Sequence, residues 1–314
     1  MDVICDLCGN KDNFKTLLAG VTDNSTAING EFNIYECLDC SHCFIDPIPA
    51  NLAEAYVSSY YTHIKASANF KSKLKNTLRK ICYSDKYFVK KFISSLVSKY
   101  LNEPPRLDHG SLCDVGCGNG QYLSDAEELG WQVYGVDFDP KAVECCIAQN
   151  MIVKLGNAEN IPFETGQFDV VRLWNVLEHT RSPKRALIEI NRVLKPNGYI
   201  VIYVPNINSV DFNVFKGHWW NLEIPRHLHH FKPLTLNKYM SQTGFIVRNI
   251  MCPGTVSSNI SKTIEVLKRN KVGRLVTLTR VFTVIISKIY FRLIKKTYEY
   301  DAGISILAQK VGQL

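Results

Sequence analysis

Three glycines at alternate positions in residues 112–120, LCDVGCGNG, constrain the fold more than any other stretch of the chain. The apolar residues before them are typical of the end of a buried strand, and residues 121–130 have a helical composition. The glycines therefore predict a tight strand-to-helix turn whose backbone can approach a ligand closely. A second apolar run, YGVDFD at residues 134–139, brings Asp137 to a strand end, where its carboxylate can accept hydrogen bonds from ribose hydroxyls. This combination indicates a nucleoside-binding site.

The glycine spacing separates two kinds of nucleotide site. A dinucleotide fingerprint needs G-x-G-x-x-G, but from Gly116 the third position is Gln121, and Gly120 comes one residue early. This spacing disfavours a nicotinamide-dependent oxidoreductase, whereas a tight turn with no ligand stays the simplest alternative. Asp114 precedes the glycines, where a carboxylate can hold the amino group of an amino-acid tail.

The order D-x-G-x-G-x-G, followed by an Asp at the next strand end, resembles class I S-adenosylmethionine-dependent methyltransferases. In that family the stretch matching GNAENIPF, residues 156–163, contacts the adenine, although Asn157 stands here where an Asp is usual. The segments NVLEHT and RVLKPNG, residues 175–180 and 192–198, also match the family. The resemblance implies a cofactor site made of Asp114, Gly116, Gly118, Gly120, Asp137, Asn157, Ala158 and Asn175.

Strands and helices alternate from residue 106 to the end, which predicts a doubly wound, Rossmann-like α/β fold with a seven-stranded sheet. After the glycine-rich strand, the remaining strands are expected at 131–136, 152–155, 168–174, 199–204, 245–251 and 303–311. Helices are expected at 141–149, 183–194 and 234–243, with a turn at 195–198.

Two cysteine pairs near the N-terminus have the spacing of a structural zinc site. Cys5 and Cys8 form one C-x-x-C turn and Cys37 and Cys40 the other, and four thiolates from two such turns can close a tetrahedral site. His42 and Cys43 are spare donors, so the fourth ligand is open, as is the alternative of cysteines without metal. Two C-x-x-C pairs before D-P-x-P resemble a group of methyltransferases associated with glycans and natural products.

An insertion at residues 205–232 contains GHWWNLEIPRHLHHF, with four histidines, an arginine and two tryptophans. A neutral imidazole can accept a hydroxyl proton near neutral pH. We therefore expect the catalytic base among His227, His179 and His230, with His227 first, and acceptor contacts from Trp219, Trp220 and Arg226. Zinc is a competing use for the histidines, but three of them lie close together in one segment and no acidic metal motif accompanies them. Packing or turn-capping is the alternative for any single one.

The charge divides the chain into an acidic body and two basic segments. The chain carries a net charge of +8, while residues 69–100 carry +8 and residues 262–296 carry +9, leaving −9 elsewhere. We expect a zinc ribbon at 1–50, a helical basic linker at 51–105 and a methyltransferase domain at 106–314 with insertions at 205–232 and 253–301. The three charges at Arg280, Lys288 and Arg292 share one helical stripe, which favours a helix lying on an anionic membrane over one crossing it.

The N-terminal composition and the motifs predict a location and a function class. Residues 1–9 are polar, so we expect no signal peptide and a cytoplasmic protein, with peripheral contact at the inner membrane face through 262–296. We expect methyl transfer from S-adenosylmethionine to a small-molecule acceptor, most simply a saccharide hydroxyl. A quinone or natural product is the alternative acceptor, and a non-catalytic zinc-ribbon nucleic-acid binder is the alternative class. The latter is disfavoured because aromatic residues do not alternate with the lysines, so no specific nucleic acid is expected.

Overall fold

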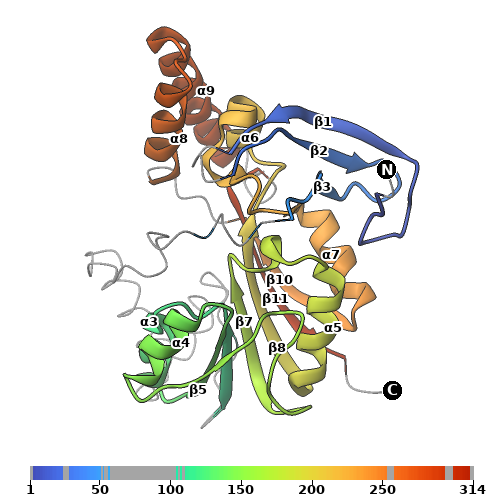
Figure 1. The fold of residues 1–314 in the computed structure, drawn as a ribbon, viewed down its shortest axis with the longest axis vertical. Helices are drawn as coiled ribbons and strands as arrows, with labels where there is room; N and C mark the ends of the chain where they lie inside the picture. Colours follow the sequence, from blue (N-terminus) through green and yellow to red (C-terminus); the bar gives the residue numbers. More distant parts are fainter. Residues whose placement is uncertain are drawn as a thin grey trace.

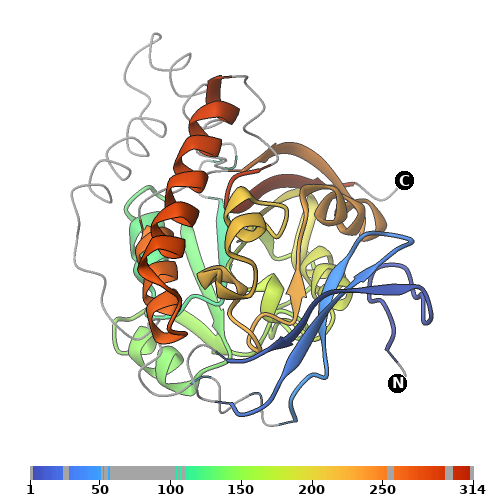
Figure 2. The ribbon, with the colours of Figure 1, turned by 90° about the horizontal axis from the view of Figure 1, so that it is seen from above.

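The computed structural model describes residues 3–23, 28–50, 110–252, 258–293 and 300–311, together with Leu52, Tyr56, Pro104 and Leu107. The linker expected at 51–105, including its lysine-rich stretch, lies outside the described residues apart from those single positions. A large sheet with helices on both faces forms the lower part of Figure 1, and a small sheet and a helical hairpin lie above it. Figure 2 shows the same parts from above, with the small sheet and the hairpin on different sides.

The central sheet has seven strands in the order β6-β5-β4-β7-β8-β11-β10, as expected for a Rossmann-like methyltransferase fold. The first five of these strands are parallel, and β11 is antiparallel to both of its neighbours. The strands are β4 (Ser111–Val115), β5 (Gln132–Asp137), β6 (Ile152–Leu155), β7 (Phe168–Trp174), β8 (Leu194–Pro205), β10 (Phe245–Met251) and β11 (Gly303–Lys310). The chain runs from β4 outward to β6 and then returns to β7 on the other side of β4. The carboxyl end of β4 is therefore the topological switch point where a ligand crevice is expected.

Helices cover both faces of this sheet, α3 and α4 on one and α5 and α7 on the other (Figure 1). Their bounds are α3 (Gln121–Glu127), α4 (Pro140–Ile147), α5 (Pro183–Val193) and α7 (Pro233–Gln242). Helix α5 buries Ala186, Leu187, Ile190 and Val193, whose spacing of three and four residues places them on one side of the helix. Every residue of β4 is buried, because a central parallel strand with helices on both faces has no solvent side.

Strand β8 differs from the expectation. It begins at Leu194 rather than at residue 199, and the turn expected at 195–198 is an irregularity within the strand. Leu194 pairs with Phe168 and Tyr199 pairs with Val170, so the ladder with β7 resumes after extra residues in β8. Asn197 takes up the irregularity with a φ of 64°. The ladder continues past the turn-forming residues because both flanking segments are held by β7.

The small sheet is the ribbon expected from the cysteine pairs. It consists of β1 (Phe14–Val21), β2 (Phe32–Cys37) and β3 (Cys43–Asp46), with a fourth strand, β9 (His229–His230), from the histidine-rich insertion. Cys43 pairs with His230 and Phe44 with His229 in an antiparallel ladder. The insertion at 205–232 therefore joins the N-terminal ribbon to the large sheet, a connection that the sequence did not indicate.

The second insertion forms a helical hairpin, α8 (Ser258–Arg269) and α9 (Arg274–Leu293), that projects from the top of the molecule (Figure 1). Helix α9 packs against α6 (Val210–Phe215). Val284 is fully buried on the inner side, and Arg280 on the same side is half-buried, whereas Leu275 and Phe282 are 78% and 64% exposed. Among the described residues, no helix combines the length and the apolar character needed to cross a bilayer.

Candidate active site

The glycine-rich loop has the left-handed backbone that its sequence predicts. Gly116, Gly118 and Gly120 have φ values of 72°, 54° and 77°, which residues with a Cβ rarely adopt. The amides of Gly116 and Cys117 donate to the carbonyl oxygen of Val136 at 2.7 and 3.2 Å, which ties the loop to the end of β5. The loop therefore turns tightly over the carboxyl ends of β4 and β5.

Asp137, the predicted ribose acceptor, lies beside this loop. Its Oδ2 accepts a hydrogen bond from the Gly118 amide at 2.8 Å, and its Oδ1 accepts one from the Asp139 amide at 3.0 Å. Each carboxylate oxygen has further lone pairs, so a diol can still be bound while the amides fix the orientation of the side chain.

A cavity of about 380 Å³ opens at this edge of the sheet, at the switch point described above. It brings together five of the predicted residues, namely Gly116, Asp137, Asn157, Ala158 and His179. The remaining lining residues are Leu52, Tyr56, Val115, Phe138, Gly156, Glu159, Val176, Thr180 and Arg181. Of these residues, Phe138 directly follows Asp137, the predicted ribose acceptor. The Tyr56 hydroxyl lies 3.0 Å from His179 Nδ1, and nothing in the sequence indicated that these two distant residues would meet.

The predicted adenine contact is already part of a turn. Asn157 Oδ1 accepts a hydrogen bond from the Glu159 amide at 2.9 Å, so one side of the carboxamide oxygen is occupied. Glu159 Oε1 in turn accepts hydrogen bonds from the amides of Arg181 and Ser182 at 2.7 and 3.1 Å. These bonds fix the cavity wall formed by the two loops.

Asp114, predicted to hold the amino group of the cofactor, is 2% exposed and does not line the cavity. Its Oδ1 accepts a hydrogen bond from Arg172 Nη1 at 2.7 Å, and the guanidinium lies 3.7 Å from the centre of the Tyr122 ring. Burial raises the pKa of Asp114, and the Arg172 charge opposes that increase. Gly118, Gly120 and Asn175 also lie outside the cavity lining, and Asn175 has a φ of 54° at the end of β7.

The three candidate bases lie near one another, His179 at the cavity and His227 and His230 behind its lining. The ring centres of His179 and His227 are 4.6 Å apart, and those of His227 and His230 are 6.4 Å apart. Burial lowers the pKa of His179 and that of His227 to about 3, and lowers the pKa of His230 well below its usual value. All three imidazoles are therefore neutral near pH 7, but only His179 lines the cavity.

A family model described as a methyltransferase domain matches residues 86–250, just over half of the chain. The chain belongs to this methyltransferase family. Its seven-stranded sheet is that of class I S-adenosylmethionine-dependent methyltransferases.

Individual relatives match parts of the chain. An uncharacterised protein in a Streptomyces fradiae transposon is 33% identical to this chain. The match covers 32% of this chain and 31% of the length of that relative. A ubiquinone biosynthesis O-methyltransferase of Nitrosospira multiformis is 26% identical over 51% of this chain and 72% of its own length. A chain from the complex of the Haloferax volcanii Trm112 methyltransferase activator with a methyltransferase superposes with a TM-score of 0.51. It is 18% identical and covers 68% of this chain and 87% of its own, so it supports the fold alone.

The residues predicted to bind the acceptor of this methyltransferase lie outside the cavity lining. Trp219 is 1% exposed and packs against Phe212 in the core that the insertion forms with the small sheet and the hairpin. Trp220 contacts α8, where Lys262 Nζ lies 4.8 Å from the centre of its ring. Arg226 is 6% exposed and lies 3.6 Å from Glu223 and 3.9 Å from Asp23. The composition of the insertion cannot separate a core tryptophan from one that faces a ligand.

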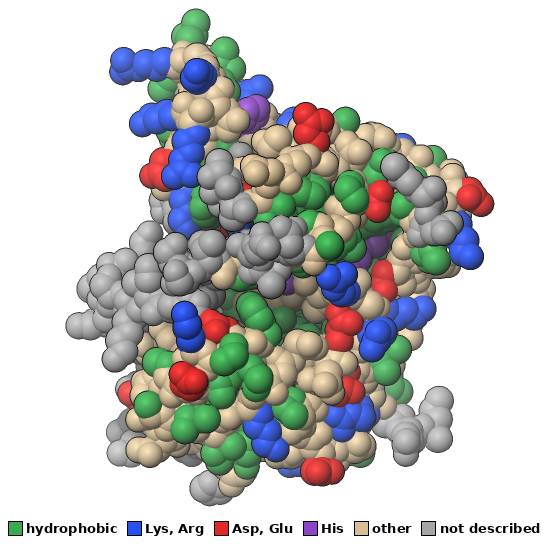
Figure 3. Space-filling view, viewed as in Figure 1, with side chains coloured by type: hydrophobic (Ala, Val, Ile, Leu, Met, Phe, Trp, Pro, Cys, Tyr) green, Lys and Arg blue, Asp and Glu red, His purple; other side chains and the backbone are tan. Residues whose placement is uncertain are grey.

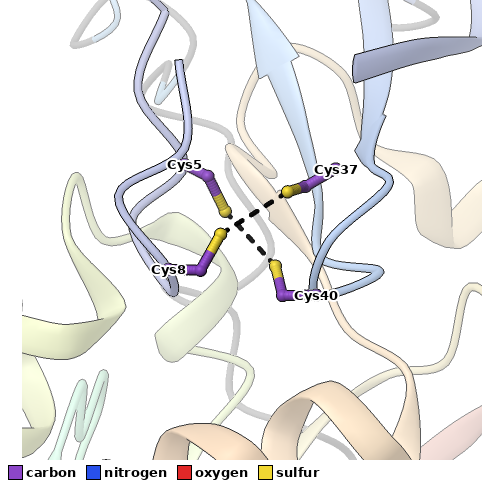
Figure 4. A group of neighbouring side chains, drawn as sticks. All are labelled: Cys5, Cys8, Cys37 and Cys40. Carbon is purple, nitrogen blue, oxygen red and sulfur yellow. Dashed lines mark hydrogen bonds between the residues drawn. The ribbon is translucent and has the colours of Figure 1, made fainter. Parts of the chain in front are cut away.

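The four predicted zinc ligands of this methyltransferase converge on one point (Figure 4). All four sulfur atoms lie within 4.8 Å of one another, with Cys5 and Cys40 Sγ 3.4 Å apart and Cys8 and Cys37 Sγ 3.5 Å apart. Tetrahedral zinc with bonds of about 2.3 Å separates its sulfur ligands by about 3.8 Å, so the arrangement fits. His42 bonds to His229 at 2.9 Å, and Cys43 Sγ lies 3.7 Å from the Ser41 carbonyl oxygen, so neither spare donor joins the group.

The cysteine cluster is attached to the cavity wall. Asp6, inside the first C-x-x-C turn, accepts hydrogen bonds from the Ser182 hydroxyl, from the Lys184 amide at 3.0 Å and from the Tyr239 hydroxyl at 3.0 Å. Ser182 is the N-cap of α5 and directly follows Arg181, which lines the cavity. The ribbon therefore contacts the segment that bounds the candidate active site.

Proposed function

We propose that this methyltransferase transfers a methyl group from S-adenosylmethionine to a hydroxyl of a small saccharide, such as a nucleotide sugar, a glycan or a lipid-linked sugar. The observation that carries the proposal is a single cavity at the carboxyl ends of β4 and β5. It has Gly116 and Asp137 on one side and a neutral imidazole, His179, on another. Nucleoside-binding groups and a candidate proton acceptor thus share one space.

The chain offers a fitting site for the cofactor. The methionine portion would lie against the backbone of Gly116, the ribose against Asp137, and the adenine against Asn157 and Ala158, all of which line the cavity. S-adenosylmethionine supplies an electrophilic methyl group on a sulfonium. The protein binds and orients the two reactants, excludes water and accepts the hydroxyl proton.

The proton acceptor is proposed to be one of His179, His227 and His230. His227 Nδ1 lies 2.9 Å from the Asn221 carbonyl oxygen, so Nδ1 carries the hydrogen and Nε2 has a free lone pair. The test is to assay His179→Ala, His227→Ala and His230→Ala with saturating cofactor. We expect at least one of the three variants to lose turnover by about 10²–10⁴-fold. Unchanged turnover in all three would refute the base assignment.

The proposed acceptor class rests on polar groups around the cavity. Thr180, Arg181 and Glu159 line it, and such groups can hydrogen-bond to several hydroxyls of one sugar ring. Arg181 can also bind a phosphate on a nucleotide sugar. A quinol is the second candidate acceptor, because a relative is named a ubiquinone biosynthesis O-methyltransferase.

Two measurements test the proposal. Calorimetry should show S-adenosylhomocysteine binding that is lost or strongly weakened in Asp137→Ala but kept in Asp125→Ala, which changes a partly exposed carboxylate on α3 outside the cavity lining. Incubation with labelled S-adenosylmethionine should then label nucleotide sugars. Label in quinols alone would select the second candidate, and wild-type affinity in Asp137→Ala would exclude this cofactor site.

Three further assignments belong to the proposal. Cys5, Cys8, Cys37 and Cys40 hold structural Zn²⁺ in a ribbon domain at 1–50, followed by the linker at 51–105 and the catalytic domain at 106–314. The hairpin of α8 and α9 contacts an anionic membrane surface from the cytoplasmic side. Its support is the exposed apolar side of α9 beside the Lys and Arg side chains gathered on the hairpin (Figure 3).

A further inference from the structure

A second group of potential metal ligands lies beside the cavity. Atoms of Glu178, His179 and His227 that can ligate a metal all lie within 4.8 Å of one another. Glu178 and His179 are in the 3₁₀ turn that follows β7, and His227 comes from the insertion that joins the ribbon sheet. No acidic metal motif accompanies the histidines of the insertion along the chain, and the fold brings Glu178 to within 4.0 Å of one of them.

The carboxylate of Glu178 is buried without compensation. Glu178 is 1% exposed, and neither of its side-chain oxygens has a hydrogen-bond partner among the described residues. Its carboxylate Oε1 lies 4.0 Å from His227 Nε2, which is too long for a hydrogen bond. A buried carboxylate without partners is rare in native proteins, because its desolvation is costly. A bound cation would satisfy these oxygens.

Both imidazoles contact a backbone carbonyl that can fix the ring, as is usual for histidines that ligate metals. His179 Nδ1 lies 3.0 Å from the Arg226 carbonyl oxygen, and His227 Nδ1 lies 2.9 Å from the Asn221 carbonyl oxygen. A carbonyl only accepts, so Nδ1 of His227 carries the hydrogen and its Nε2 keeps the lone pair. His179 Nδ1 has a second partner, the Tyr56 hydroxyl at 3.0 Å, so in the same tautomer its Nδ1 hydrogen is shared between the carbonyl and that hydroxyl. Histidines that ligate metals almost always donate their other N–H in this way, which fixes the ring and the tautomer.

The separations also fit a shared ion. His227 Nε2 lies 4.0 Å from Glu178 Oε1 and 3.8 Å from Glu223 Oε2, which is too long for hydrogen bonds. Two nitrogen or oxygen donors on one ion with bonds of about 2.1 Å lie about 3 to 4 Å apart. The positive charge of Arg226 is close by, but Glu223 and Asp23 face it at 3.6 and 3.9 Å.

We propose that Glu178, His179 and His227 bind a divalent first-row transition-metal ion, in addition to the zinc held by the cysteines. Two imidazoles and one carboxylate suit Zn²⁺, Mn²⁺ or Fe²⁺, whereas Mg²⁺ prefers oxygen ligands alone. Because His179 also lines the cavity, the ion is at the acceptor end of the site. Given the methyl transfer proposed above, the ion lowers the pKa of an acceptor hydroxyl bound to it.

The ion and a proton compete for the same nitrogen lone pairs of His179 and His227. When the ion is bound, neither of these two histidines can be the base. His230 is then the remaining imidazole of the group, since its Nε2 has no hydrogen-bond partner among the described residues. Loss of turnover in a His227 variant fits a ligand and a base equally. Metal content, rather than turnover, therefore tests this inference.

The test uses the full-length protein, stripped of metal, reloaded with Zn²⁺ and freed of excess ion by gel filtration before elemental analysis. Wild-type protein should hold two equivalents of Zn²⁺ per chain. The Glu178→Gln and Cys8→Ser variants should each hold one equivalent. His218→Ala, which removes a half-buried imidazole elsewhere in the insertion, should keep two. One equivalent in wild type, or two in Glu178→Gln, would overturn the proposal.

A spectroscopic measurement on the wild-type protein tests the second metal site without any variant, so it does not depend on whether a variant folds. Co²⁺ at the cysteines gives intense thiolate charge-transfer absorption, whereas Co²⁺ at nitrogen and oxygen ligands gives only weak visible bands. We expect a second equivalent to add weak bands without further charge transfer, and the absence of those bands would contradict the site. Calorimetry with S-adenosylhomocysteine on the same samples reports the cofactor site separately, so failure of one proposal is not failure of the other.

Discussion

Gly116 is needed both for its backbone conformation and for the space above its Cα. Its φ of 72° favours glycine, and a Cβ built there would lie 2.5 Å from Val176 Cγ2. Val176 follows β7 and lines the same cavity, so the loop and the next strand end are packed directly against each other. A substitution at this position therefore acts on the fold of the site as well as on the space for a ligand.

Gly116→Ala should destabilise the protein more than Gly166→Ala. Gly166 has a φ of 69°, but nothing lies within 4 Å of a Cβ built there. Backbone strain alone costs about 1–2 kcal/mol, which both variants share. The contact with Val176 adds about 1–3 kcal/mol in Gly116→Ala only. Urea denaturation measures the difference, and equal midpoints for the two variants would show that the Val176 contact relaxes without cost.

The two aspartates predicted to bind the cofactor have different surroundings. Asp137 lies at the cavity with both oxygens held by backbone amides, whereas Asp114 is buried against Arg172. Removal of one partner from a buried ion pair commonly costs about 3–5 kcal/mol. Loss of function in an Asp114 variant could therefore result from lower stability of the fold and would not by itself show a contact with the cofactor.

At the scale of elements, α9 is the helix with an unusual surface. Its side chains at Leu275, Leu278, Phe282 and Ile286 are 78%, 57%, 64% and 49% exposed, and their spacing places them on one side. Val284 and Thr277, 0% and 9% exposed, anchor the other side to the protein. An exposed apolar side next to basic residues is the arrangement of interfacial helices.

Phe282→Glu should weaken the proposed binding to vesicles of anionic phospholipid by about tenfold or more, because it replaces a large apolar contact with a charge that the lipid repels. Co-sedimentation measures the effect. Ile188→Glu is the control, since Ile188 is 53% exposed on α5, away from the hairpin. Wild type that stays in the supernatant, or equal binding of both variants, would count against the membrane contact.

At the scale of the whole molecule, the small sheet and the seven-stranded sheet with its helices are joined by direct contacts. Asp6 holds the start of α5, and His229 Nε2 lies 3.2 Å from the Arg181 carbonyl oxygen while its Nδ1 bonds to His42 of the ribbon. Both contacts end on residues 181–184, next to the cavity. A change in the cysteine cluster can therefore reach the candidate active site without any contact with a ligand.

Cys8→Ser should abolish the proposed zinc site of the ribbon and loosen residues 180–184. We expect faster amide hydrogen exchange in this segment and weaker binding of S-adenosylhomocysteine. Cys145→Ser is the matched control, because Cys145 is an exposed cysteine on α4 outside the cluster. If exchange quickens only within the ribbon itself, the two parts are not coupled.

The sequence by itself determined the features that depend on neighbours along the chain. The glycine turn, the strands at 152–155, 168–174 and 245–251, and the two cysteine turns were predicted at their positions, because backbone conformation and hydrophobic pattern are local properties.

The tertiary structure alone decided which distant side chains meet. It paired Asp114 with Arg172, buried Trp219, attached His229 and His230 to the ribbon sheet, and brought Glu178 to His227. A histidine or an aspartate can be a ligand, a base or an internal partner with the same local pattern. Its role follows from burial and from neighbours that only the packing of the chain brings within reach.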